Sequence, residues 1–127
     1  MGDVEGNGSR SEQPVRDVHG YTAVEFEHGA QTVRVDRAHP VISIGRDLRN
    51  DLVVNQDLVS RQHLRAQFSR GRCTITDNST NGSMIEMSDG ARIELRRESL
   101  RLRGSGLIIP GKPQTALTEF AIKFRCV

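Results

Sequence analysis

The residues that could do chemistry in this chain form an ordered series between positions 45 and 82. Short runs typical of strands separate them, so each group falls on a connection between strands. The series consists of Gly45, Arg46, Asn50, Ser60, Arg61, His63, Thr80, Asn81 and Gly82. It combines cations, hydroxyl groups and carboxamides, which are the donors that a phosphate dianion requires. The pattern therefore indicates binding of a phosphorylated peptide rather than the breaking of a bond.

Each of these side chains has a specific use in holding phosphate or peptide. Arg46 follows a predicted strand and can offer two parallel N–H groups to two phosphate oxygens. Ser60 and Thr80 supply hydroxyl groups, while Arg61 adds a backbone amide or a second cation. The carboxamide of Asn81 can hold a peptide main chain as donor and acceptor together. Taken singly each residue is better explained as a surface or turn residue, so the hypothesis depends on their joint order and spacing.

The elements that must position these residues are short alternating or apolar runs, broken by turn residues about every eight to twelve positions. This pattern predicts an all-β fold, a two-sheet β-sandwich of about eleven strands with its binding site on the apical loops at one end. The expected strands are residues 21–27, 31–35, 41–44, 51–54, 63–69, 73–77, 83–87, 92–95, 100–102, 107–109 and 120–124.

Composition sets the domain organisation. Residues 1–20 are rich in Gly, Ser, Asn, Gln and charge and predict a flexible tail or linker, whereas residues 21–127 predict one β-sandwich domain. No apolar run resembles a signal peptide or a membrane span, so we expect a cytoplasmic location and no membrane partner. Cys73, Cys126 and four scattered histidines lack the spacing of metal ligands, and we expect no metal and no cofactor.

Four segments carry a resemblance to a known family. They are Gly45-Arg46, Asn50-Asp51-Leu52-Val53-Val54, Leu58-Val59-Ser60-Arg61-Gln62-His63 and Asp77-Asn78-Ser79-Thr80-Asn81-Gly82-Ser83. Together they resemble the forkhead-associated (FHA) domain, most strongly over residues 41–87. The resemblance implies an eleven-stranded sandwich that binds phosphothreonine peptides through its apical loops.

The resemblance also assigns expected roles to the series. Four residues would contact phosphate, namely Arg46, Ser60, Arg61 and Thr80. Asn81 would hold the peptide backbone, and Asn50 would also face the peptide. The remaining three, Gly45, His63 and Gly82, would shape the loops, with the ring of His63 holding its neighbours by hydrogen bonds.

Two departures from the family pattern bear on specificity and context. Members that favour an acidic residue three places after the phosphothreonine carry a basic residue where this chain has Leu58, so we expect an apolar preference at that peptide position. The Arg-rich stretch 93–106 replaces a shorter turn and is similar to FHA modules appended to bacterial nucleotidyl cyclases. This likeness suggests the regulatory part of an attached or partner signalling enzyme.

The sequence also bears on three other classes of function. An enzyme based on Ser60 and His63 would need a sharp bend, because side chains three apart on a strand face opposite ways. Nucleic-acid binding would use the arginines of 92–103, yet interleaved glutamates and a net charge of only +2 favour a salt-bridged surface. A phosphate-independent scaffold or oligomerisation domain stays open as the alternative to phosphothreonine recognition.

Overall fold

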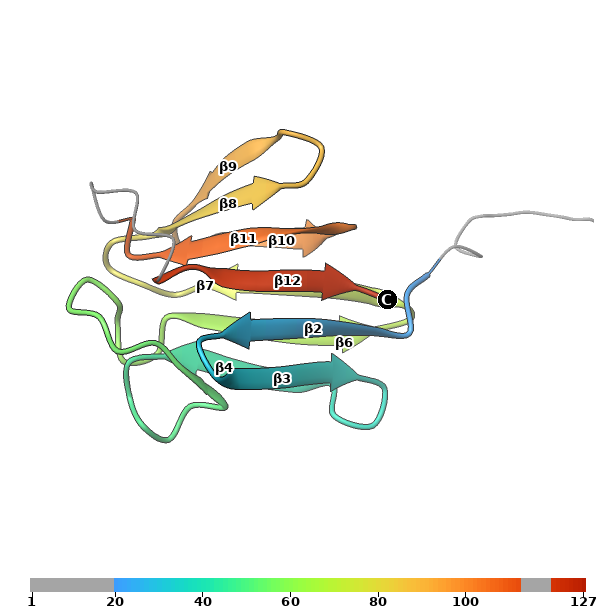
Figure 1. The fold of residues 1–127 in the computed structure, drawn as a ribbon, viewed down its shortest axis with the longest axis horizontal. Helices are drawn as coiled ribbons and strands as arrows, with labels where there is room; N and C mark the ends of the chain where they lie inside the picture. The colour runs from blue at the N-terminus through green and yellow to red at the C-terminus, as the bar shows by residue number, and fades with distance from the viewer. Residues whose placement is uncertain (1–19, 113–119) are drawn as a thin grey trace, which may run out of the picture.

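The computed structural model describes residues 20–112 and 120–127. Within these ranges, eleven strands form two sheets stacked face to face (Figure 1). The all-β prediction and the expected two-sheet sandwich are confirmed. The predicted tail, residues 1–20, lies outside the described residues except for Gly20.

One sheet has six strands in the order β3-β2-β12-β11-β8-β9, and all of its neighbouring pairs are antiparallel. Its members are β2 (Ala23–His28), β3 (Gln31–Asp36), β8 (Ser83–Met87), β9 (Arg92–Leu95), β11 (Ser105–Pro110) and β12 (Ile122–Cys126). The N-terminal hairpin β2–β3 thus joins the C-terminal strand, because β12 pairs with β2.

The other sheet has five strands in the order β10-β7-β6-β4-β5. Its members are β4 (Val41–Gly45), β5 (Leu52–Val53), β6 (Leu64–Ser69), β7 (Arg72–Asp77) and β10 (Ser99–Leu102). Strand β6 shows the period-two pattern that one buried face requires, since Leu64, Ala66 and Phe68 are buried and the residues between them are exposed.

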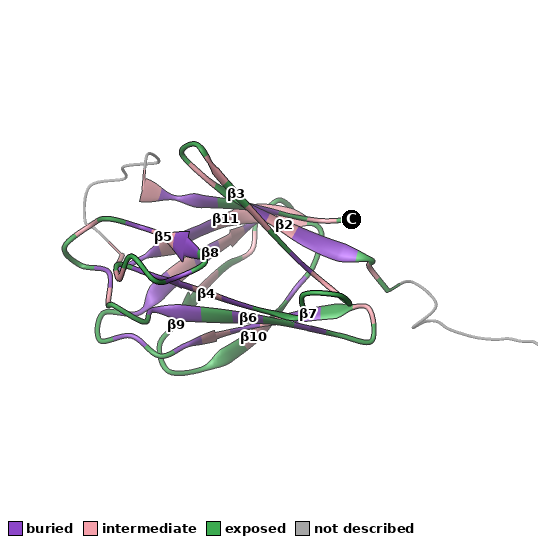
Figure 2. Ribbon diagram, turned by 90° about the horizontal axis from the view of Figure 1, so that it is seen from below, coloured by how far each residue is buried: buried purple, intermediate pink, exposed green. Residues whose placement is uncertain are grey.

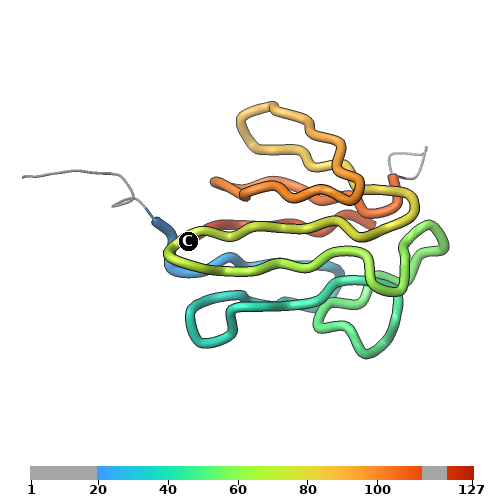
Figure 3. Tube along the Cα trace, turned by 180° about the vertical axis from the view of Figure 1, so that it is seen from behind, coloured from blue at the N-terminus to red at the C-terminus, as the bar shows by residue number. Residues whose placement is uncertain are grey.

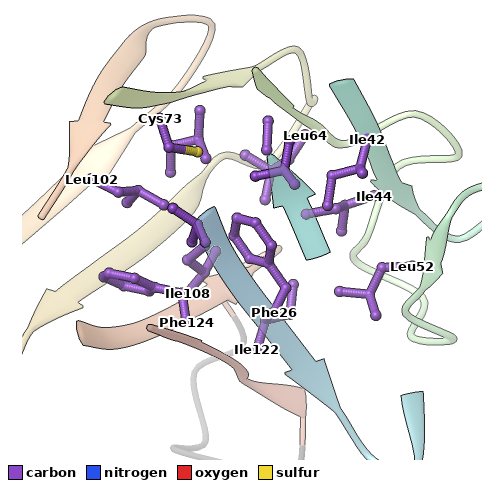
Figure 4. Close-up of a cluster of buried hydrophobic side chains, with 14 of the residues drawn as sticks. Phe26, Ile42, Ile44, Leu52, Leu64, Cys73, Leu102, Ile108, Ile122 and Phe124 are labelled. Atoms are coloured by element: carbon purple, nitrogen blue, oxygen red, sulfur yellow. The ribbon is translucent and has the colours of Figure 1, made fainter. Parts of the chain in front are cut away.

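The core lies between the two sheets and is almost entirely apolar. Phe26 and Phe124 are its largest fully buried side chains, and isoleucines from both sheets pack near them (Figure 4). Colouring by burial shows the same division, with inward-facing segments buried and most connections exposed (Figure 2). Burial of this area supplies the main stabilisation of the fold, and it fixes the strand ends from which the functional loops emerge.

The connections gather at two opposite ends of the sandwich. One end carries the connections 46–51, 54–63, 78–82 and 96–98, and the other carries the hairpin at Arg70–Gly71 and the connection at 37–40 (Figures 1 and 3). Antiparallel neighbours send alternate connections to opposite ends, and the short β5, which pairs with β4 in parallel, keeps both of its own connections at the first end. Four segments that are distant in sequence are therefore brought together at the first end.

The short strand β5 forms one edge of the five-stranded sheet, and it is covered by a side chain from the other sheet. The amide of Gln31 donates from Nε2 to the carbonyl oxygen of Val53 at 2.7 Å and accepts the Val53 N–H at Oε1 at 2.9 Å. This reciprocal pair copies the bonding of a neighbouring strand. It joins the edge strand β3 of one sheet to the edge strand β5 of the other.

Candidate functional site

Three connections at one end of the sandwich, residues 46–51, 54–63 and 78–82, form what we call the loop cluster (Figures 1 and 3). Backbone hydrogen bonds tie them to one another. The N–H of Arg46 donates to the carbonyl of Ser60 at 3.0 Å, and the N–H of Asn78 donates to the carbonyl of His63 at 2.9 Å. The loops therefore have defined positions although they are not strands.

Gly45 permits the close approach of the first two loops. A Cβ at this position would lie 2.1 Å from the carbonyl oxygen of Arg61, which no real side chain tolerates. Asn50 occupies the neighbouring space, where its Nδ2 donates to the carbonyls of Asp47 at 2.8 Å and Arg61 at 2.7 Å. Glycine is needed here for space and not for a positive φ.

The position of Asn50 differs from the expectation that it faces the peptide. Its side chain is only 7% exposed, and both hydrogen bonds of its Nδ2 go to loop carbonyls. Its Oδ1 has no hydrogen-bond partner among the described residues. Asn50 thus holds two loops together from beneath, because the backbone carbonyls on the 46–51 and 54–63 connections need a buried donor.

The side chains expected to contact phosphate lie on the exposed side of the loop cluster. Arg46 is oriented by a hydrogen bond from its Nε to the carbonyl of Val59 at 3.1 Å. Ser60 accepts the N–H of Thr80 at its Oγ at 3.2 Å, which leaves the Ser60 hydroxyl hydrogen available. Within residues 20–112 and 120–127, the Nη groups of Arg46 and the hydroxyl of Thr80 have no hydrogen-bond partner. Arg61 is exposed beside them.

Asn81 and Leu58 meet across two of the loops. The Asn81 Nδ2 donates to the carbonyl of Leu58 at 2.9 Å, and the Oδ1 of this exposed residue has no hydrogen-bond partner in the described ranges. The Leu58 side chain is 43% exposed and lies beside Gly111, where a Cβ would meet it at 2.9 Å. Leu48, which the sequence reasoning did not single out, is 85% exposed on the first loop. The exposed surface of the loop cluster therefore mixes apolar and polar side chains.

His63 is fully buried beneath the loop cluster, with both ring nitrogens engaged. Its Nδ1 accepts the backbone N–H of Ser60 at 2.9 Å, so Nε2 carries the proton and faces the Gly82 carbonyl at 2.9 Å. Burial holds the pKa of His63 below its usual value, opposed by the Gly82 carbonyl and the charge of Asp77. The neutral ring links the Ser60 loop to Gly82 and leaves no nitrogen free to act as a base on the Ser60 hydroxyl.

Asp77 forms a second buried support that the sequence reasoning missed. Its carboxylate accepts the Ser79 N–H at 2.9 Å, the Ser79 hydroxyl at 2.8 Å and the Ser83 hydroxyl at 2.8 Å. Burial alone would raise the pKa of Asp77, but these hydrogen bonds outweigh it and the pKa is lowered. The sequence signal was an Asp followed two residues later by Ser, a pattern typical of a side-chain-stabilised turn.

The same support positions the loop that carries Thr80 and Asn81. The Ser79 hydroxyl oxygen accepts the Gly82 N–H at 2.7 Å, and Gly82 has φ +81°. A Cβ at Gly82 would also lie 2.9 Å from the carbonyl oxygen of Leu95. Gly82 therefore meets both demands at once, a left-handed backbone and a close approach.

The arginines of the stretch 92–103 do not share one face. Arg92 lies on β9 in the six-stranded sheet and pairs with Glu86 at 3.3 Å, whereas Arg101 lies on β10 in the five-stranded sheet. Arg103 pairs with Asp89 at 2.8 Å. The salt bridges expected for this stretch form, but with acidic residues outside it. This distribution gives no continuous basic track for a nucleic-acid backbone.

The described residues contain no cluster of three or more His, Cys, Asp or Glu that could hold a metal ion. In the same ranges no helix is long or apolar enough to cross a lipid bilayer. What the loop cluster presents is a set of fixed hydrogen-bond donors with two cations, suited to a dianion. The fold is a β-sandwich whose long loops gather at one end, and these loops carry the candidate contact surface.

Comparison with known proteins gives the family. The model of the FHA domain matches residues 42–108, which is more than half of the chain. The chain belongs to the FHA family, whose domains are interaction modules and not enzymes. No curated protein sequence matches it.

Solved structures agree with this fold. The FHA-1 domain of Mycobacterium tuberculosis Rv1747 has 24% identity and a TM-score of 0.63, over 84% of this chain and 98% of that one. The N-terminal FHA domain of S. cerevisiae Rad53p, solved with a phosphothreonine peptide, has 17% identity and a TM-score of 0.57, over 82% and 91% of the two chains. The FhaA FHA domain, solved with the intracellular domain of Rv3910, has 21% identity and a TM-score of 0.57, over 81% and 98%.

Proposed function

We propose that this chain is a phosphothreonine-peptide recognition module that mediates phosphorylation-dependent association between proteins. The observation that carries the proposal is the arrangement of Arg46, Ser60 and Thr80. The guanidinium of the exposed Arg46 is held by its Nε against the carbonyl of Val59, next to Ser60, and the Thr80 N–H donates to the Ser60 Oγ at 3.2 Å, so a cation and two hydroxyl-bearing residues come together. A phosphate dianion offers three acceptor oxygens and a charge of about −1.5 to −2, which such a set of donors matches.

The remaining contacts follow from the same geometry. Asn81 supplies an acceptor for a peptide N–H, and Arg61 supplies a second cation at the rim of the site. Leu58 supplies an exposed apolar contact for a residue near the phosphothreonine. We propose no catalytic role, because both ring nitrogens of His63 are occupied in holding the loops.

The proposed cellular setting follows from the source of the ligand and from the state of the cysteines. A Ser/Thr kinase must supply the ligand, so we place the protein in the cytoplasm, where an attached or partner signalling enzyme would be regulated. The thiols of Cys73 and Cys126 are free, and burial raises the pKa of the Cys73 thiol to about 12. Structural disulfides are typical of secreted domains of this kind, so two free cysteines support the placement.

The test is a titration of the protein with a degenerate phosphothreonine peptide pool, beside its phosphoserine and unphosphorylated counterparts. We expect micromolar binding that requires phosphothreonine. Arg46→Ala should weaken it by about 2 to 5 kcal/mol, because the bound phosphate would lose its desolvated cation. The matched control is Arg65→Ala, since Arg65 is also exposed but lies on strand β6 and not on the loop cluster.

Two results would contradict the proposal. Binding that ignores the phosphate, or that Arg46→Ala leaves unchanged, would show that the partner uses another surface. The fold would then serve as a phosphate-independent scaffold or oligomerisation domain. Binding lost equally in Arg46→Ala and Arg65→Ala would point to general charge attraction instead of a specific contact.

A further inference from the structure

A fourth connection, residues 96–98 between β9 and β10, lies against the loop cluster and brings a further arginine to it. The Nε of Arg97 donates to the carbonyl of Ser79 at 3.3 Å, and its backbone N–H donates to the Asp77 carboxylate at 3.2 Å. Ser79 directly precedes Thr80. Arg97 is therefore anchored beside a residue of the proposed phosphate site, although 17 positions separate them in sequence.

Arg97 and Arg46 are held in the same manner on opposite flanks of that site. Arg46 donates its Nε to the carbonyl of Val59, next to Ser60, and Arg97 donates its Nε to the carbonyl of Ser79, next to Thr80. In both cases the described residues offer the Nη groups no hydrogen-bond partner. Since the Ser60 hydroxyl contacts the Thr80 N–H at 3.2 Å, the two arginines bracket one continuous surface.

The backbone of Arg97 is fixed by this environment. Its φ is +56°, in the left-handed region that favours glycine, and the bond to buried Asp77 holds it there. Arg70 has nearly the same φ, +53°, in the hairpin at the far end of the sandwich. A positive φ alone thus does not mark a binding residue. What distinguishes Arg97 is its position against the loop cluster.

The charges around Arg97 leave it available to an anion. Lys112 lies on the same side, with its Cε 3.3 Å from where a Cβ on Gly82 would stand, and it pairs with Glu94 at 3.5 Å. The Glu98 carboxylate accepts the N–H of Arg96 at 3.4 Å. Neither glutamate is within ion-pair distance of the Arg97 guanidinium in the described ranges.

We propose that Arg97 is a specificity-determining residue that binds a second anionic group on the same peptide, a carboxylate or a second phosphate, on the β9–β10 side of Thr80. The inference rests on the proposed function, because it needs a peptide held by its phosphothreonine. Arg46 and the hydroxyl groups take the phosphothreonine, and Arg97 selects among phosphorylated peptides by the charge of a flanking residue. An exposed guanidinium with two free Nη groups suits either anion.

The experiment compares the wild-type protein with Arg97→Gly in a phosphothreonine peptide library with degenerate flanks. Glycine suits the backbone conformation at position 97, so it removes the side chain without disturbing the turn. Arg70→Gly is the matched control, because it removes an arginine of the same backbone conformation at the opposite end. Arg97→Gln is the second variant, and thermal unfolding verifies that each protein is folded.

We expect the wild-type protein and Arg70→Gly to enrich Asp or Glu at one flanking position. Arg97→Gly and Arg97→Gln should lose that enrichment and still require phosphothreonine. Affinities are then measured for individual phosphothreonine peptides that carry Asp, Asn or phosphoserine at the selected position. Removal of the Arg97 side chain should weaken the Asp peptide by about three- to tenfold and leave the Asn peptide unchanged. A larger loss for the phosphoserine peptide identifies a second phosphate as the preferred anion, and a larger loss for Asp identifies a carboxylate.

The failures of the two proposals are distinct. An acidic enrichment that survives in Arg97→Gly, or no acidic enrichment in the wild type, overturns the role of Arg97 while phosphothreonine binding stands. Equal weakening of the Asp and Asn peptides also overturns it, because Arg97 would then only support the loop. No phosphopeptide binding by the wild-type protein overturns the proposed function, and the inference falls with it.

Discussion

The two ends of the sandwich are built by different means. All five buried polar or charged side chains in the described residues lie under or beside the loop cluster, and they are Asn50, His63, Asp77, Ser79 and Ser83. The far end has short turns such as Arg70–Gly71 and Asp89–Gly90, closed by backbone hydrogen bonds and exposed ion pairs. The same strands run between the two ends, so only the connections differ.

The difference shows what irregular loops require. A tight hairpin satisfies its own backbone groups, so the far end needs little beyond glycine at its turns. Long connections leave donors and acceptors unpaired, and the loop cluster satisfies them with buried side chains. Exposed side chains of the proposed site, such as Arg46, are thereby carried on loops that are supported from the interior. The comparison predicts that matched substitutions have much larger effects at the loop end.

The largest difference in stability is expected between alanine substitutions of two glycines, one at each end of the sandwich. Gly45→Ala places a Cβ 2.1 Å from the Arg61 carbonyl oxygen, and we expect it to lower the free energy of unfolding by about 3 kcal/mol or more. Gly90→Ala meets no neighbour within 4 Å and suffers only from its φ of +97°, a cost of about 1 kcal/mol. Urea unfolding of both variants measures the contrast. Equal losses of stability in the two variants would show that the connections 46–51 and 54–63 readily move apart to admit the added methyl group.

A smaller difference in stability is expected between asparagine substitutions of two aspartates. Asp77→Asn replaces a buried acceptor of several hydrogen bonds and should lower the free energy of unfolding by about 2 to 3 kcal/mol. Asp89→Asn at the far end alters an exposed pair with Arg103 and should leave unfolding nearly unchanged. Urea unfolding measures both, and phosphopeptide affinity should fall only in Asp77→Asn. Similar stability for the two variants would contradict the supporting role of Asp77.

The smallest effect is a pH dependence that comes from His63. Burial lowers its folded pKa below 6.5, so the unfolded chain takes up a proton first as the pH falls. Stability should be constant above about pH 6.5 and fall below it, by less than about 1.4 kcal/mol per pH unit for one proton. The lowered pKa of Asp77 adds a further loss only under more acidic conditions, below its usual value of 3.8.

Unfolding curves between pH 7.5 and 5 test this prediction. His39→Gln is the control, because His39 is exposed at the far end and its side chain is 82% accessible. The fall in stability should persist in His39→Gln. A flat profile in the wild type, or a fall that His39→Gln abolishes, would show that His63 is not the group responsible.

The strands could be predicted from sequence because each pattern is local. All eleven expected runs overlap a strand of the structure, and the alternation of β6 directly reflects its buried face. The predicted boundaries of the strands are less accurate. The run expected at 120–124 forms β12 at Ile122–Cys126, because Ala121 and Ile122 are buried consecutively and the alternation begins only after them. Pairing partners, which set such boundaries, are not visible in a local pattern.

The site was predictable in its residue types and less so in its geometry. The order of Arg46, Ser60 and Thr80 indicated three loops at one end, and the structure brings them together. The burial of Asn50 could not be predicted, since it depends on the space beside Gly45. Arg97 stood in an Arg-rich stretch with no local feature to separate it from its neighbours. Its contact with Ser79 arises only from the packing of two distant loops.

The bond pair between Gln31 and Val53 has a consequence for how this domain meets other chains. An open strand edge invites a foreign peptide to add itself as a further strand, which is a common route to both ligand binding and aggregation. At β5 the Gln31 amide already occupies the donor and acceptor that such a peptide would use. A visiting chain would have to displace it and separate β3 from β5. One glutamine thus closes the β5 edge of the five-stranded sheet to strand addition.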